Sequence, residues 1–247
     1  MIDTNWLKTA RRISVIGMAS AILASCGLSP EQDRAAIEEG ILSTPSTQEL
    51  WQTIKAEYPE DFNTLIDRLQ ALELHERRDE SNSEEIGKAW LQEFFDRIGP
   101  DSVKAPAEQL LMWSASEQEL YSALQRSSVT DCAAMTMGQW IFIDESNTIA
   151  TSAIGRRNAA MVRAAAAGRD DPQTYAEPND AAFIRLGDSI AATGIDPDLQ
   201  ATLGSDAAMA ALDPAQQCEI GVAVYAGLSA LPDDVEPEMA AYMLSPE

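Results

Sequence analysis

The sequence is poor in the residues on which most catalytic and metal sites are built. It has one histidine, His75, and three cysteines in 247 residues. A site with three histidine ligands is therefore excluded, and a Ser-His-Asp or Cys-His arrangement would have to use His75. We interpret His75 as a helix-end residue, because the dipole at the end of a helix favours histidine there. The sequence also contains no G-x-S-x-G turn, glycine-rich phosphate loop or H-E-x-x-H motif.

Positive charge is scarce as well. Seventeen Lys and Arg stand against 40 Asp and Glu, which gives a net charge of −23. This charge argues against binding to nucleic acid or to an anionic bilayer surface. It is typical of a solvated acidic surface, and it also suits divalent cations or a basic partner. Carboxylates are so frequent that no pair stands out as a glycosidase pair. We therefore predict no catalytic residues, no cofactor and no enzymatic activity.

Long apolar runs are missing too. The uncharged, mostly apolar segment at residues 13–23 is too short to span a bilayer, which takes about 20 apolar residues. Three basic residues, Lys8, Arg11 and Arg12, come before it. A basic start followed by a short apolar run is typical of a cleaved secretory signal.

The segment ends with the motif Leu23-Ala24-Ser25-Cys26. An aliphatic residue, two small residues and a cysteine resemble the lipobox of bacterial lipoproteins. The resemblance implies that residues 1–25 are a signal peptide, and that Cys26 carries lipid and becomes the first mature residue. The alternative is an ordinary signal peptide with an unrelated cysteine. Gly27 stands where enteric lipoproteins of the inner membrane carry aspartate, so the resemblance favours the outer membrane, with the domain facing the periplasm.

The implied lipid anchor sets the geometry of the mature chain. Lipoproteins of this class carry three acyl chains, which anchor stably, whereas a single chain binds a membrane only marginally. Residues 26–28 form a tether that spans roughly 10 Å when extended. Because the leader carries three basic residues against Asp3, its removal lowers the net charge from −23 to −25.

Two cysteines, Cys132 and Cys218, remain in the mature chain. In an exported chain such a pair predicts one disulfide, although a buried pair of free thiols is the alternative. Metal ligation is disfavoured, since no histidine or further cysteine lies at ligand spacing from either residue.

Apolar residues recur at steps of three and four, which predicts an all-α irregular globule of roughly nine to eleven short amphipathic helices. We expect a subdomain boundary near residue 128 that separates two packed helical parts, residues 29–127 and 128–247. Residues 140–143 are either a strand or the end of a helix that starts near Thr130. The expected helix starts and stops are listed here: starts at Ser29, Ser46, Pro59, Ser116, Asp196 and Asp213, and stops at Gly99-Pro100, Gly168, Gly194 and Pro232.

Two segments are candidate sites. Arg156, Arg157, Arg163 and Arg169 form the densest basic segment, which either receives an acidic partner group or pairs with carboxylates of the same chain. The loop from residue 170 to 180 is either solvated or a weak cation site. Its oxygen ligands would be the following residues: Asp170, Asp171, Glu177 and Asp180.

The leading functional hypothesis is a lipid-anchored periplasmic protein without enzymatic activity, which contacts a protein partner in the cell envelope. The alternative is a carrier whose pocket, lined by Trp and Met, holds a small apolar or cationic ligand. Tryptophans at helical spacing are more often core residues than a platform for a ligand, which counts against this alternative. A carboxylate-dependent hydrolase of cell-wall polymer is a third, weaker hypothesis.

Overall fold

The computed structural model describes residues 15–16, 29–72, 80–139, 141–143 and 146–245. It confirms the all-α fold, with twelve helices in these residues. The helices are α2 (Pro30–Leu42), α3 (Gln48–Glu57), α4 (Pro59–Gln70), α6 (Glu80–Ser102), α7 (Ala107–Ser127), α8 (Val129–Thr136), α9 (Thr148–Asp170), α10 (Asp180–Ala192), α11 (Pro197–Gln200), α12 (Asp206–Ala210), α13 (Pro214–Leu228) and α14 (Glu236–Leu244).

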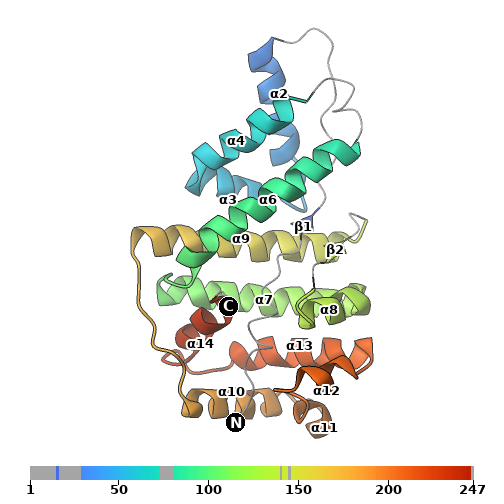
Figure 1. Cartoon of the computed structure of the whole chain (residues 1–247), viewed down its shortest axis with the longest axis vertical. Coiled ribbons are helices and arrows are strands. Elements are labelled where there is room, and N and C mark those ends of the chain that lie inside the picture. The colour runs from blue at the N-terminus through green and yellow to red at the C-terminus, as the bar shows by residue number, and fades with distance from the viewer. Residues whose placement is uncertain (1–14, 17–28, 73–79, 140, 144–145, 246–247) are drawn as a thin grey trace.

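The helices are stacked along the long axis of the molecule. Figure 1 shows α9, α7, α13 and α10 as successive layers, each in contact with the next. Helices α2, α3 and α4 cap one end of this stack, where α3 and α6 pack on α9. Helices α10 and α11 lie at the opposite end.

One continuous apolar core runs through the stack. Its largest side chains in the capping end include Phe62, Phe94 and Phe95, and Tyr121 lies in the stack itself. The buried residues from both sides of residue 128 belong to the same cluster. Ser127 ends α7 and Ser128 caps α8, and α7 and α8 pack against each other. Division into two subdomains at this point stays a prediction.

A minimal pair of strands accompanies the helices. β1 (Val15–Ile16) lies parallel to β2 (Phe142–Ile143). Residues 140–143 are expected from the sequence to be either a strand or the end of a helix. α8 ends earlier, at Thr136, and residues 142–143 form the strand. β1 lies within residues 1–25, the predicted signal peptide, so a mature chain that begins at Cys26 would lack this pair, which has no independent stability at two residues a strand.

Most of the helix starts are confirmed, and each has a local cause. The Ser29 side chain accepts from the amide of Gln32, whose own side chain accepts from the Ser29 amide, so a complete capping box opens α2. Asp213 and Gln216 form the same box at α13. Proline at the first helical position opens α4 and α11 as expected.

Two predicted starts, the capping boxes of Ser46 with Glu49 and of Ser116 with Glu119, are not formed. Ser116 lies inside α7, and its hydroxyl donates to the carbonyl of Trp113. Ser46 is not the cap of α3, because Thr47 takes that position without a side-chain hydrogen bond. The glutamates of both patterns bind arginines of α9 instead, as described below.

Two predicted stops are also wrong. α6 continues through Pro100 and ends at Ser102, so the missing amide of the proline affects only the last turn. α9 passes Gly168 and ends at Asp170. A Cβ atom built at Gly168 would lie 2.0 Å from the carbonyl oxygen of Asp101, so this glycine permits close packing of α9 on α6. Gly194 does follow the end of α10, at φ +85°.

The predicted disulfide is present. Cys132 in α8 and Cys218 in α13 are bonded, with their Cα atoms 5.0 Å apart, and both residues are buried. The bond joins two helices that pack against each other across 86 residues of sequence.

Several sequence predictions concern residues outside the described part of the chain. These include the lipobox motif with Cys26, and also His75 and Trp140. Among the described helices, none combines the length and the apolar character that crossing a membrane requires.

Candidate functional site

A cavity of about 600 Å³ opens on the side of the helix stack. Three segments enclose it: the turn after α6, the loop between α9 and α10, and one face of α14. Its lining mixes aromatic, aliphatic and charged residues, which are listed here: Val103, Lys104, Pro172, Gln173, Thr174, Tyr175, Ala176, Glu177, Pro178, Glu238, Ala241, Tyr242 and Ser245.

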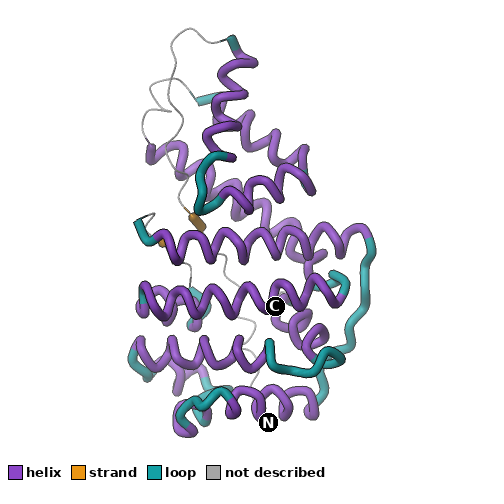
Figure 2. Tube along the Cα trace, turned by 180° about the vertical axis from the view of Figure 1, so that it is seen from behind, coloured by secondary structure: helices purple, strands orange, loops and turns teal. Residues whose placement is uncertain are grey.

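The loop between α9 and α10 is held in place as a wall of the cavity. Figure 2 shows this loop, residues 171–179, running along the side of the stack. The Gln173 amide donates to the carbonyl of Lys104 at 2.7 Å, and the Tyr175 hydroxyl donates to the carbonyl of Ala105 at 2.7 Å. Both bonds attach the loop to the same turn, so the wall has a defined position although it has no regular secondary structure.

Two tyrosines give the cavity its aromatic surface. Tyr175 and Tyr242 are both half-buried. The ring of Tyr242 packs edge-to-face on Phe183 of α10, with ring centroids 5.5 Å apart. Burial raises the pKa of the Tyr175 phenol above its ordinary value.

Two carboxylates and one ammonium group supply the charge. Lys104 is paired with Asp101, one turn back in the chain, at 3.1 Å. Glu177 is exposed on the loop, and Glu238 is half-buried on α14. Neither glutamate makes an ion pair with any described residue. Glu238 lies in the first turn of α14, where the helix dipole favours a carboxylate.

Of the four carboxylates predicted as a weak cation site, only Glu177 lines this cavity. Asp170 instead accepts two hydrogen bonds from Arg169, which lower its pKa, and Asp180 opens α10. The described residues contain no group of three or more His, Cys, Asp or Glu that could hold a metal ion.

The arginines predicted as a basic patch all bind groups of the same chain. Arg156 forms a two-pronged bond with Glu119 of α7, at 3.1 and 2.6 Å. Arg163 donates to Glu49 of α3 at 2.9 Å and to the hydroxyl of Thr53 at 3.2 Å. These are the glutamates of the two misread capping patterns. Contact of this segment with an external partner stays a prediction.

Arg157 is the only member of the predicted patch that is buried. It is 2% exposed and donates to Glu117, itself 1% exposed, at 2.5 Å. The Asn158 side chain accepts a further bond at 3.1 Å. Two charged groups buried away from water are stable only when each is bound to a partner. Here the ion pair joins α7 to α9 in the interior of the stack.

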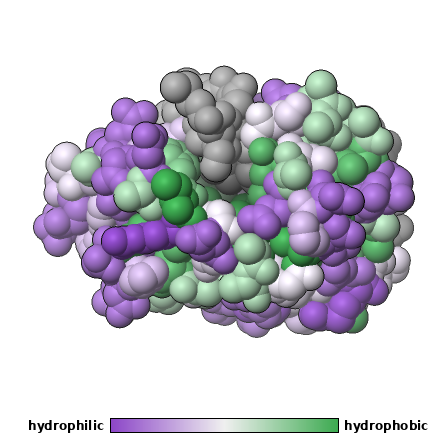
Figure 3. All heavy atoms as spheres, turned by 90° about the horizontal axis from the view of Figure 1, so that it is seen from below, coloured by the Kyte–Doolittle hydropathy of each residue, from purple (hydrophilic) through white to green (hydrophobic). Residues whose placement is uncertain are grey.

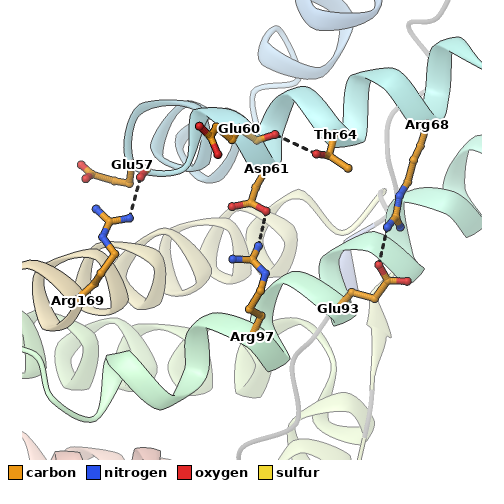
Figure 4. A network of polar contacts seen from close by, with 8 residues as sticks. All are labelled: Glu57, Glu60, Asp61, Thr64, Arg68, Glu93, Arg97 and Arg169. Carbon is orange, nitrogen blue, oxygen red and sulfur yellow. Dashed lines mark hydrogen bonds and ion pairs between the residues drawn. The ribbon is translucent and has the colours of Figure 1, made fainter.

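Arg169 contacts the capping helices through a backbone carbonyl and an aromatic ring. Its guanidinium donates to the carbonyl of Glu57 at 3.2 Å and lies 4.8 Å from the ring centroid of Tyr58. Figure 4 shows it beside two pairs that join α4 to α6, namely Arg68 with Glu93 at 2.8 Å and Arg97 with Asp61.

The tryptophans of the described chain are core residues. Trp51, Trp90 and Trp113 are 2–3% exposed, and none of them lines the cavity. Trp51 and Trp90 pack on each other with ring centroids 6.2 Å apart, between α3 and α6. The pocket lined by Trp and Met that the carrier hypothesis anticipated is therefore replaced by one lined by Tyr and Glu.

Sequence reasoning missed Tyr175, Glu238 and Tyr242. Tyr175 could have been found, because it is an aromatic residue in a nine-residue loop with a proline near each end. Long ordered loops often carry functional residues. The two α14 residues gave no signal, because only the folded chain brings their helix to the loop.

Comparison of the chain with protein-family models, with curated proteins and with solved structures found no match. The site is therefore interpreted from its own residues.

Proposed function

We propose that this chain is a lipid-anchored protein of the cell envelope, facing the periplasm, that acts by contact with another envelope protein and not by catalysis. The observation that carries the export half of the proposal is the bond between Cys132 and Cys218. Disulfides form and persist in oxidising compartments and are rare in the bacterial cytosol. Together with the lipobox motif ending at Cys26, the bond supports an exported, membrane-attached protein.

The arrangement of the helices supports contact with a partner at the far end of the molecule. α2 begins at Pro30, four positions after Cys26, so a lipid at Cys26 would hold the end capped by α2, α3 and α4 close to the membrane. The end formed by α10 and α11 would then point away from it. Figure 3 views that end and shows groups of hydrophobic residues among hydrophilic ones. Ile184 of α10, 61% exposed, is the most exposed large apolar side chain of the described residues.

Crosslinking in intact cells tests this proposal. A photo-crosslinking residue replaces Ile184, and the chain is recovered from solubilised membranes. We expect one crosslinked protein partner from the Ile184 position and a weaker yield when the same residue replaces Asp67, at the membrane end. Equal yields from both positions, or none from either, would count against partner contact through the α10 end.

A second candidate function, a carrier of a small ligand, is favoured by the cavity of about 600 Å³. Pockets that hold small molecules usually have volumes of about 300–1,000 Å³. Native mass spectrometry of the full chain purified from its source tests for a bound ligand. Ala176→Trp, a change in an exposed position of the cavity wall, should remove the extra mass, whereas the same mass in both proteins would place the ligand elsewhere.

A further inference from the structure

We infer that the cavity binds a small organic cation, an ammonium group attached to an apolar body. This inference rests on the carrier function proposed above and names the class of ligand. The cavity joins three features that such a ligand needs: carboxylates that pair with no described cation, aromatic rings and an aliphatic wall.

The charges of the lining favour a cation over an anion. Glu177 lines the cavity from the loop and Glu238 lines it from α14, and neither forms an ion pair with a described residue. Lys104, the one basic residue of the lining, is held by Asp101. An anion would therefore meet two unpaired carboxylates, while a cation would compensate them. The net charge of −23 also creates a long-range negative potential, which attracts cations and repels anions.

The aromatic residues fit the same class of ligand. The face of a tyrosine ring attracts ammonium groups, and quaternary ammonium ligands are commonly held by several such rings. The Tyr175 hydroxyl is already bonded to the carbonyl of Ala105, so this side chain offers the cavity its ring. Arg169 lies over the ring of Tyr58 elsewhere in this chain, which is the same kind of contact made internally.

The rest of the lining fits an apolar body better than a bare metal ion. Val103, Ala176 and Ala241 offer only carbon atoms in their side chains, and prolines stand near both ends of the loop. A hard divalent cation takes six to eight oxygen ligands at about 2.3–2.6 Å. The cavity is lined by only two carboxylates, and its volume is far larger than such an ion needs.

The two hydrogen bonds from the loop to the turn after α6 hold this wall in position without a ligand. A wall that is already in place lowers the entropic cost of binding. We therefore expect binding without a large change in the fold.

Calorimetric titration of the purified full chain tests the inference, with benzyltrimethylammonium as the probe cation. Benzyl alcohol and phenylacetate serve as neutral and anionic probes with the same ring. We expect the cation to bind at least tenfold more tightly than either. Glu238→Gln should weaken its binding by about tenfold, as expected for loss of one interaction with a charged group.

The matched control is Glu219→Gln, which removes one exposed carboxylate of α13 that does not line the cavity. Equal weakening by both variants would show a general charge effect and overturn the inference. Tighter binding of benzyl alcohol or phenylacetate, lost in Ala176→Trp, would overturn the cation class while leaving the carrier function intact. No binding of any probe, together with no ligand in native mass spectrometry, would remove both.

Discussion

At the scale of single residues, the buried ion pair of Arg157 and Glu117 is the ion pair whose loss should lower the stability of the chain most. Both side chains are almost fully buried, so each depends on the other for compensation of its charge. Arg157→Ala leaves the Glu117 carboxylate buried and unpaired. We expect it to lower the free energy of unfolding by about 3–5 kcal/mol, measured by urea denaturation.

The neighbouring pair of Arg156 and Glu119 is the matched control. Both side chains are 41–50% exposed, so Arg156→Ala should cost less than about 1 kcal/mol. Replacing the buried pair together, Arg157→Met with Glu117→Leu, should restore most of the lost stability. Similar losses for Arg156→Ala and Arg157→Ala would contradict the assigned burial.

A second residue prediction concerns alkaline pH. Burial raises the pKa of Tyr58 from 10 to about 12 in the folded chain. The unfolded chain loses this proton first, so folding stability is complete below pH 10 and falls as pH rises from 10 to 12. Tyr58→Phe should reduce the slope of unfolding free energy against pH in this window. An unchanged slope would show that Tyr58 is not the group responsible.

The arginines of α9 also show which contacts can be predicted from the sequence and which cannot. The arginines of α9 were recognisable as a basic segment, and pairing within the chain was one of two open readings. Their partners Glu49, Glu117 and Glu119 lie 37–114 positions away, and two of the three were first read as helix-start residues. Only the packing of α9 against α3 and α7 decides which acid each arginine meets.

At the scale of elements, close approach of helices depends on particular glycines. A Cβ at Gly168 would lie 2.0 Å from the Asp101 oxygen and 2.9 Å from the Ala105 nitrogen, both backbone atoms. Gly168→Ala should therefore force α9 from α6 and lower the free energy of unfolding by about 1–3 kcal/mol. Thermal unfolding followed by circular dichroism measures the loss.

Gly187, inside α10, provides the opposite case. Nothing lies within 4 Å of a Cβ built there, so Gly187→Ala should stabilise the chain by about 0.5–1 kcal/mol through its better helix propensity. A loss of stability in Gly187→Ala, or none in Gly168→Ala, would contradict the packing described for these two helices.

Prediction of elements succeeded where the signal was local. Ser29, Pro59 and Asp213 act on backbone groups within three residues, and the helices they start were predictable. Gly99-Pro100 and Gly168 failed as stops, since α6 ends two residues after Pro100 and α9 two residues after Gly168. The cavity could not be predicted, since the loop and α14 meet only in the folded chain.

At the scale of the whole molecule, the disulfide is the covalent link across the stack. It closes a loop of 86 residues, for which the loss of unfolded-chain entropy is worth about 4–5 kcal/mol. The double variant Cys132→Ala with Cys218→Ala should lose stability of this order in urea denaturation. The wild-type chain with this bond reduced by dithiothreitol is the control and should unfold near the midpoint of the double variant. Equal midpoints for the oxidised wild type and the double variant would contradict a stabilising bond.

The central claim is that this helical stack is exported and attached to a membrane through Cys26. Intact-mass and peptide mass spectrometry of the chain extracted from the membrane fraction tests it most directly. We predict a chain that begins at Cys26, with the added mass of acyl chains on that residue. A chain that begins at Met1, or one cleaved elsewhere and free of lipid, would contradict it.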